Sequence, residues 1–253
     1  MSEINADDWD THWAHIGTSA EINPAQRYRR KEIFAALAAT GQPEKLLDVG
    51  SGQGDFLRAA ASRWPEADLL GVEHSSTGAE ISAAKVPEAR FVRRDLLADD
   101  VPPPAFAKWA THAVCSEVLE HVDNPTELLR QAQRFMSQGC WLVVTVPGGP
   151  RSAFDRHIGH RRHYTRADVE RSLHEAGFSD ICVHRSGFPI FNLYKLIVIA
   201  RGKRLVADVR SSTEGVAASL PARLAMRVFD LLFRLARPDS RWGWQLIAVC
   251  RLP

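Results

Sequence analysis

The sequence predicts an α/β protein with a doubly wound, mainly parallel sheet. Short apolar segments of strand-like composition alternate with segments whose apolar residues recur at helical spacing. Glycines or acids follow the strand-like segments, and the segment 140–146 is apolar throughout, as in a central strand covered on both faces. Four strand–helix units leading into a fifth strand would form, through right-handed crossovers, a parallel sheet with helices on both sides.

The elements follow one another with clear boundaries. Strands are expected at 46–49, 67–73, 89–93, 111–117, 140–146, 178–183 and 244–250. Helices are expected over about 25–39, from 56, over 77–85, from 124 to about 137, and from 165 to 176. Gly41 with Pro43 ends the first helix, and Asn124 and Thr165 have the composition of N-caps. A fold with polar strand ends binds its ligand at the carboxyl edge of the sheet.

Composition indicates an ordinary globular protein. The 253 residues are 45% hydrophobic and 25% charged, with a formal net charge of +2, so a general nucleic-acid-binding surface is not expected. The four cysteines are scattered in apolar segments, as expected for buried thiols in a reducing compartment. The acidic, polar N-terminus has no apolar signal core, and no run of about 18 apolar residues occurs. We therefore expect a cytoplasmic protein.

The loop from Asp48 to Gly54 organises the chain. Gly50, Gly52 and Gly54 follow the first strand and precede a helix, which favours close approach of a ligand to bare backbone. A dinucleotide loop has the spacing G-x-G-x-x-G, whereas this spacing is G-x-G-x-G with an acid two residues earlier. A carboxylate there suits an ammonium group better than a pyrophosphate. A purely structural glycine turn is the remaining alternative.

This D-x-G-x-G-x-G pattern resembles motif I of the class I S-adenosylmethionine (SAM) methyltransferases. The resemblance implies a Rossmann-like, seven-stranded sheet in which the last strand is antiparallel. It also implies that the loop, with Ser51, holds the methionine half of SAM. Glu73, about twenty residues on, suits a ribose diol, and His74 would line the adenosine. Asp95 and the backbone of Leu96 correspond to the adenine contact of the family. We assign Ser116 and, from the N-terminal arm, Tyr28 to the same cofactor site.

The segment from Glu117 to His121 follows the fourth strand, where the acceptor would meet SAM. It resembles the motif of a methyltransferase subset that includes the ubiquinone-biosynthesis and small-RNA 2′-O-methyltransferases, some of which bind a divalent metal. Glu117, Glu120 and His121 would share a face if this turn is helical, and His160 would complete the set. The alternative is that these residues only orient the acceptor or hold the loops.

Histidines then recur at three-residue spacing in the loop after the fifth strand. The pattern from Gly159 to Thr165, G-H-x-R-x-Y-T, resembles bacterial methyltransferases in which this loop closes over the acceptor. A neutral histidine is a competent general base near pH 7. We expect His160 in that role, with His157 as second choice, His121 as a further candidate and His163 as a structural residue. The alternative is a basic loop held by stacking and hydrogen bonds.

The chain is expected to be one domain. Residues 1–40 form an N-terminal lid and helix, 41–187 the core, 188–240 a helical insertion or cap, and 241–253 the final strand. Residues 223–237 have an amphipathic pattern of leucines and arginines, and 201–222 are expected to be a mobile loop. The insertion either packs on the sheet edge, binds the acceptor, forms a homodimer interface or lies on a membrane surface.

The predicted function is methyl transfer from SAM to an oxygen or nitrogen of a small-molecule acceptor, including natural-product, sugar or lipid-linked acceptors. The methyl group is already activated by the sulfonium, so the protein mainly aligns the acceptor and removes its proton. Two alternatives remain. One is a nicotinamide-dependent oxidoreductase, and the other is a SAM-binding partner protein without turnover.

Overall fold

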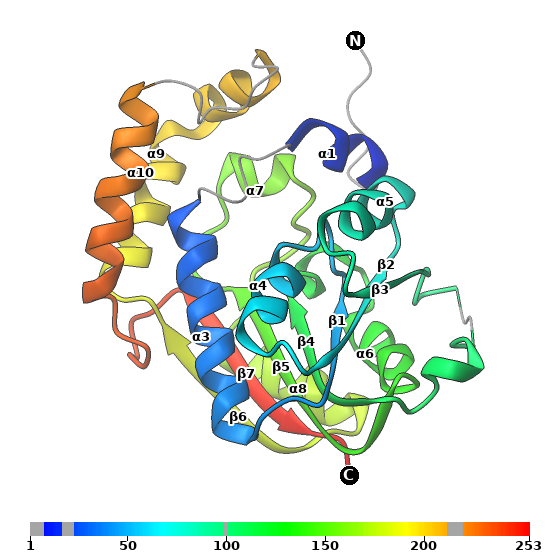
Figure 1. Ribbon diagram of the computed structural model, residues 1–253. Coiled ribbons are helices and arrows are strands. Elements are labelled where there is room, and N and C mark those ends of the chain that lie inside the picture. Colours follow the sequence, from blue (N-terminus) through cyan, green and yellow to red (C-terminus); the bar gives the residue numbers. More distant parts are fainter. Residues whose placement is uncertain (1–7, 17–22, 99–100, 212–219) are drawn as a thin grey trace.

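A seven-stranded mixed sheet forms the centre of the molecule (Figure 1). The computed structural model describes residues 8–16, 23–98, 101–211 and 220–253. The strands, in the spatial order β3-β2-β1-β4-β5-β7-β6, are β1 (Lys45–Val49), β2 (Asp68–Glu73), β3 (Arg90–Arg93), β4 (Ala110–Ser116), β5 (Met136–Pro147), β6 (Ser179–Ser186) and β7 (Gln245–Arg251). The pairs from β3 to β5 are parallel, and β7 lies antiparallel between β5 and β6. The predicted fold class is confirmed, including the antiparallel last strand.

Helices cover both faces of the sheet (Figure 1). On one face α3 (Pro24–Thr40) and α4 (Asp55–Arg63) bury side chains such as Leu37 and Leu57 against Leu46 of β1. On the other face α6 (Pro125–Gln133) and α8 (Arg166–Ala176) pack Leu129 and Leu173 into the core that contains Leu47. Neighbouring residues of a strand point to opposite faces, so adjacent leucines in β1 serve two cores. α5 (Ser76–Lys85) packs beside β2 and β3.

Side-chain caps fix where these helices begin. Asn124 accepts a hydrogen bond from the Glu127 amide at the start of α6, and Thr165 forms a reciprocal capping box with Asp168 at the start of α8. Each bond satisfies a backbone donor that has no partner within the helix. Gly177 ends α8 with φ 96°, a left-handed conformation that glycine adopts without a steric penalty. The predicted caps at these helices therefore form.

Two boundaries differ from the sequence prediction. α6 ends at Gln133 and β5 already begins at Met136, because Met136 pairs with Ala110 of β4 and extends the ladder past the predicted start at 140. The predicted mobile loop 201–222 was wrong for its first half, since α9 (Ile190–Ser211) continues through it with a non-helical residue at Gly202. Residues 212–219 lie outside the described part of the chain.

The insertion between β6 and β7 packs on α3 beside the end of edge strand β6. It comprises α9, α10 (Leu220–Leu232) and the 3-10 turn η4 (Phe233–Leu235). Phe191 and Phe233 form a buried cluster with Tyr28 of α3. α9 also contacts α7 (Ala153–His157), the short helix that precedes the histidine loop. The insertion is thus in contact with the segment that carries the candidate base.

The carboxyl edge of the sheet gathers the remaining short elements. The 3-10 turn η2 (Leu119–His121) follows β4 at this edge, whereas the turn η1 (Pro104–Phe106) precedes β4 at the opposite, amino edge. α1 (Trp9–Ile16) lies across this edge beside α5 (Figure 1). None of the helices in the described residues is both long enough and apolar enough to cross a membrane.

Candidate active site

The glycine loop folds tightly over the end of β1. Gly50, Gly52 and Gly54 have φ values of 72°, 54° and 75°, a conformation that other residues rarely adopt. The amides of Gly50 and Ser51 donate to the carbonyl of Val72, which ties the loop to β2. A Cβ atom on Gly50 would lie 2.5 Å from the Val118 side chain. The loop therefore touches the segment that follows β4, and the two candidate sites adjoin each other.

Asp48 and Glu73 lie together beneath this loop. Both are buried, and burial together with the negative charge of Glu73 raises the pKa of Asp48 to about 8. Glu73 accepts hydrogen bonds from the amides of Gly52 (2.7 Å) and Ser75 (3.0 Å). A carboxylate has about four acceptor positions, so two amide bonds leave room for a diol. The two acids thus lie together at the strand ends beneath the glycine loop, and their contact with the cofactor remains a prediction.

His74, Asp95 and Leu96 occupy the neighbouring strand ends. His74 Nδ1 lies 3.8 Å from Asp95 Oδ2 on the surface, and Asp95 Oδ1 accepts from the Leu97 amide. Leu96 packs partly buried against the main core. Asp95 is therefore held by the turn after β3, with its outer carboxylate oxygen facing His74.

Among the assigned serines, Ser51 and Ser116 differ in their partners. The buried Ser51 hydroxyl makes no hydrogen bond to any residue that the structure describes. Ser116 lies 2.9 Å from the Thr145 hydroxyl, and that hydroxyl is bonded in turn to Glu117. Ser51 consequently keeps its donor and both acceptor positions for a ligand, whereas Ser116 keeps its acceptor positions.

The structure places Tyr28 away from the cofactor loop. Its hydroxyl lies 2.5 Å from Ser186 Oγ and donates to the Arg237 carbonyl, and its ring stacks on Phe233. Position 28 lies on the face of α3 that meets the insertion, which sequence spacing alone did not reveal. The contacts of Tyr28 in the structure are packing contacts with the insertion, and its contact with the cofactor remains a prediction without support from them.

Glu117 turns away from the predicted metal set. Its φ of 57° is unusual for a residue with a side chain. The carboxylate forms an ion pair with Arg29 at 2.9 Å and accepts from Gln245 and Thr145. The turn after it is 3-10, and the left-handed residue directs Glu117 to α3 and β7 instead of along the face of Glu120. Glu117 thus links three elements behind the site.

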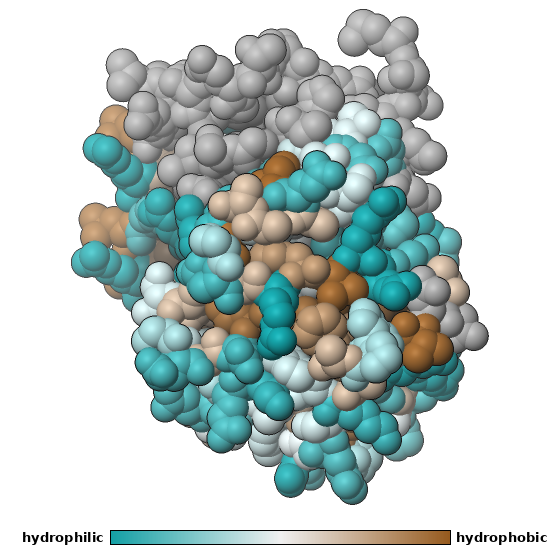
Figure 2. Space-filling view, turned by 45° about the vertical axis from the view of Figure 1, so that its right-hand side comes forward, coloured by the Kyte–Doolittle hydropathy of each residue, from teal (hydrophilic) through white to brown (hydrophobic). Residues whose placement is uncertain are grey.

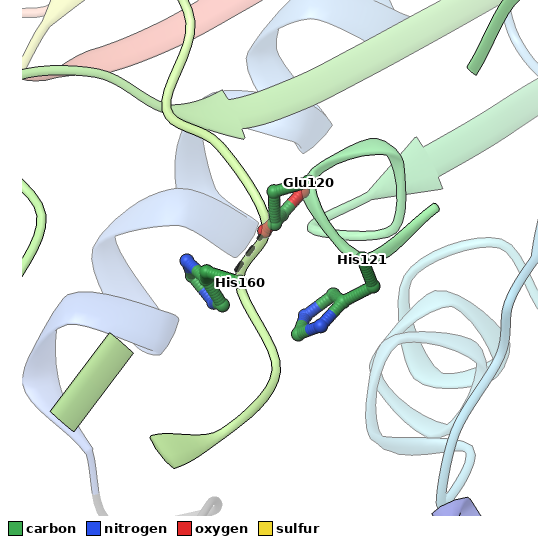
Figure 3. Close-up of side chains that lie close together, drawn as sticks. All are labelled: Glu120, His121 and His160. Atoms are coloured by element: carbon green, nitrogen blue, oxygen red, sulfur yellow. Dashed lines mark ion pairs between the residues drawn. The ribbon is translucent and has the colours of Figure 1, made fainter. Parts of the chain in front are cut away.

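Glu120, His121 and His160 do come together (Figure 3). One ligand atom from each lies within 4.8 Å of the others. Glu120 is fully buried, and neither of its oxygens accepts a hydrogen bond from the described residues. Burial and the nearby Glu117 raise its pKa well above the ordinary value. A buried carboxyl without hydrogen bonds is costly, so this arrangement has the donors of a divalent-cation site.

A chain of hydrogen bonds sets the proton positions of His160. The Gly149 carbonyl can only accept, so Nδ1 of His163, 3.0 Å away, carries the proton. Nε2 of neutral His163 is then an acceptor, and Nδ1 of His160 donates to it across 3.3 Å. His160 keeps a lone pair on Nε2, which lies 3.9 Å from Glu120 Oε1. Burial, with His121 adding to it, lowers the pKa of His160 to about 2, so the ring is neutral.

Asp155 and Lys195 extend this chain, and sequence reasoning missed both. Asp155 Oδ2 lies 3.8 Å from His163, and Oδ1 accepts from Lys195 Nζ at 2.5 Å. Burial disfavours the charged carboxylate, but the Lys195 ammonium outweighs it and lowers the pKa of Asp155. Lys195 interrupts the apolar segment 188–200, which was the available signal. His157, the second candidate base, ends α7. In the described residues it belongs neither to the group of Glu120, His121 and His160 nor to the neighbouring group of Asp155, His160 and His163.

α1 lies over both parts of the site. Asp10 accepts from the hydroxyls of Ser75 and Ser76 and from the Thr77 amide at the start of α5. A Cβ on Gly52 would lie 2.9 Å from the Trp13 ring, and the Trp9 ring meets the His121 ring edge-on at 4.7 Å. One helix therefore contacts the glycine loop and the histidine cluster.

Comparison with known proteins gives the same family. Residues 25–183 match the methyltransferase domain family. The trans-aconitate 2-methyltransferase of Rhodococcus jostii is 29% identical over 128 residues, which are 49% of this chain and 48% of that protein. The ubiquinone biosynthesis O-methyltransferase of Nitrosomonas europaea is 25% identical over 162 residues, which are 61% and 63% of the two chains. This chain thus spans about half the length of the first of these relatives.

A solved structure shares the fold. Phosphoethanolamine N-methyltransferase 2 of Haemonchus contortus, in complex with S-adenosyl-L-methionine, aligns with a TM-score of 0.55 at 18% identity, over 87% of this chain and 52% of that one. The family match extends from α3 into β6 and includes the glycine loop, Glu73 and the histidine cluster. This family match argues against a nicotinamide-dependent oxidoreductase, and the loop also lacks the glycine spacing of a dinucleotide-binding protein. The strand order, the acids beneath the loop and the sequence match together show that the chain belongs to the class I SAM-dependent methyltransferases.

Proposed function

We propose that the protein transfers the SAM methyl group to a hydroxyl or amino group of a small-molecule acceptor, with His160 as the base. The observation that supports the proposal is the group of buried Glu120 and His160 with half-buried His121 beside the glycine loop. The name of the Nitrosomonas relative specifies an O-methyltransferase, which favours oxygen.

The reaction is a displacement at the sulfonium methyl carbon. A lone pair of the acceptor forms the new bond to carbon as the carbon–sulfur bond breaks, and S-adenosylhomocysteine leaves with a neutral sulfur. Nε2 of His160 takes the acceptor proton, since its lone pair faces the cluster. A hydroxyl becomes strongly acidic as its oxygen bonds to the methyl carbon, so even a ring whose pKa is lowered by burial accepts the proton in that step. Glu73 holds the ribose, and Asp48 lies beneath the methionine end. Alignment of the two reactants supplies much of the rate enhancement.

The same residues fit a divalent cation as an alternative to the base role, since a bound cation would occupy the Nε2 lone pair of His160. Glu120, His121 and His160 would hold it, because the Glu120 oxygens lack other partners and His160 presents a free lone pair. When bound, such a cation lowers the pKa of an acceptor hydroxyl. With Glu117 paired to Arg29, the proposed donor set has three protein residues, which leaves positions for the acceptor.

α1 is proposed as a lid over this site. Asp10 anchors it to α5, while Trp9 and Trp13 contact the acceptor side and the cofactor side respectively. Exclusion of water by such a segment strengthens the electrostatic contacts inside. Entry of SAM then requires α1 to move away from the glycine loop.

The decisive experiment supplies methyl-labelled SAM and fractionated small-molecule extracts, and identifies labelled products by mass. The wild-type protein is expected to label a product that His160→Ala labels at least about a hundredfold more slowly, the scale of general-base catalysis. SAM affinity, measured by calorimetry, is expected to stay within about twofold of the wild-type value, a difference below ~0.5 kcal/mol.

His174→Ala is the matched control, since His174 is an exposed histidine on α8. It should label the product at the wild-type rate. SAM binding without any labelled product would favour the alternative of a partner protein without turnover. Equal rates for His160→Ala and His174→Ala would remove the base from position 160.

A further inference from the structure

The outer face of α10 has a row of exposed apolar side chains. Leu224, Val228, Leu231 and Leu235 are 65%, 49%, 61% and 67% exposed. Their spacing of four, three and four residues places them in one stripe along the helix and into η4. Hydrophobic side chains alternate with hydrophilic ones along the left-hand edge of the molecule, where the insertion lies (Figure 2). A continuous row of this kind marks an interaction surface.

The opposite face of α10 packs against α9 and α3, so the leucine stripe lies on the outer face of the helix. Phe229 meets Tyr194 of α9 edge-on at 5.4 Å, and Phe233 stacks on Tyr28 at 5.1 Å. Leu232 packs against the same cluster. These contacts fix the rotation of α10 about its axis, and the leucine stripe has to face away from the protein.

Arginines flank the stripe. Arg227 and Arg234 are exposed, and both lie on the same side of the stripe. Each follows a leucine of the stripe, Leu224 or Leu231, by three residues, which is less than one helical turn. The acid of the helix, Asp230, is paired with Arg27 of α3. In the turn after η4, Arg241 lies over the ring of Trp242, which is itself 58% exposed. Cationic and aromatic side chains beside an apolar row are typical of helices that lie in the headgroup region of a membrane.

We propose that the α10 stripe docks on an anionic lipid bilayer surface. Leu224, Val228 and Leu231 would enter the acyl boundary, and Arg227 and Arg234 would lie at the level of the lipid phosphates. A second copy of the chain fits less well, because a two-fold pairing of this stripe would bring the arginines of both copies together while Asp230 is already engaged.

The position of the surface is related to the active site through α9. α9 packs beside α10 and places Lys195 against Asp155 of the histidine chain. On its outer side α9 exposes Leu193 and Leu196. The docking surface would thus hold the active site near the bilayer, which suits an acceptor that resides there. The proposal itself does not rest on the assigned catalytic roles.

The test is co-sedimentation of the full chain with vesicles. Vesicles of phosphatidylglycerol and phosphatidylcholine are expected to bind the protein, with affinity falling as salt rises, and pure phosphatidylcholine vesicles to bind it far less. Leu231→Asp should abolish the binding. Arg227→Gln should weaken it about fivefold, from roughly 1 kcal/mol per basic residue at such a surface.

The matched control is Val101→Asp, which places the same charge at an exposed apolar residue outside the insertion and should bind like the wild-type protein. Gel filtration of each variant measures the oligomeric state in parallel. Equal sedimentation with and without anionic lipid would overturn the proposal. So would a dimer that Leu231→Asp dissociates while vesicle binding is unchanged, since the stripe would then be an interface between two copies.

Discussion

Arg29 provides the sharpest test of how the site is held, because its neighbour Arg27 serves as an internal control. Both arginines lie on α3 and both pair with an acid. The Arg29–Glu117 pair is largely buried, with side-chain exposures of 14% and 19%, whereas Arg27 and Asp230 are 45% and 29% exposed. Arg29→Ala leaves the Glu117 carboxylate buried without its cation.

The expected loss follows from what remains around Glu117. Gln245 and Thr145 still donate to it after the substitution, so the cost stays at the lower end of the range for a broken buried pair, about 2–3 kcal/mol in the free energy of unfolding. A chain of this length loses about 2–4 °C in Tm per kcal/mol, which gives a decrease of roughly 4–12 °C. Arg27→Ala should cost about 0–1 kcal/mol, as for an exposed pair.

Thermal and urea unfolding of both variants measure the difference. Restoring neutrality with the double variant Arg29→Ala, Glu117→Gln should recover part of the loss, since no buried charge is then left without a partner. Equal Tm values for Arg27→Ala and Arg29→Ala would refute the reasoning, and the buried network around Glu117 would then carry no special stability.

Four further outcomes are expected. His163→Phe removes the acceptor of His160 Nδ1–H and should lower turnover or metal affinity about 10–100-fold at unchanged SAM affinity. His163→Gln should recover part of this loss, and equal values for both variants would contradict the hydrogen-bond chain. If Glu120, His121 and His160 hold a cation, EDTA should abolish turnover and Mn²⁺ or Mg²⁺ should restore it; unchanged turnover in EDTA would leave His160 as a metal-free base. Asp10→Ala should weaken SAM binding about fivefold in calorimetry, from the roughly 1 kcal/mol of a lost cap, and wild-type affinity would argue against the lid. The pKa of Asp48 is raised in the folded state, so the unliganded protein should lose stability as pH rises from about 4 to 8; Asp48→Asn should flatten that slope in urea unfolding, and an identical slope would count against a protonated Asp48.

The sequence predicted the positions of the acids at the ends of β1 and β2 better than the position of Glu117. Asp48 and Glu73 follow strands of a parallel sheet, and the topology brings such strand ends together whatever their side-chain partners are. Glu117 was misplaced because the helical spacing assumed for Glu120 and His121 does not hold across a left-handed residue, and single-sequence patterns do not specify a positive φ at a glutamate.

Two long-range contacts of the site could not be predicted from local sequence patterns, for a different reason. Tyr28 bonds to Ser186, and Asp155 bonds to Lys195, so each pair joins segments that only the packing of the insertion brings together. Periodicity identifies which face of a helix is apolar, but it does not say which other element covers that face. α9 was therefore expected as an apolar segment without its contact to the histidine loop.

The salt bridge between Lys195 and Asp155 couples the insertion directly to the histidine loop. Lys195 comes from α9, and its ammonium keeps Asp155 charged beside His163, which orients the candidate base. A chimera that received the insertion of a relative without this lysine would alter the protonation of Asp155 in the histidine loop. Changes in α9 and changes in the histidine chain are expected to evolve together, so engineers of this scaffold should transplant α9 and the loop 149–165 as one unit.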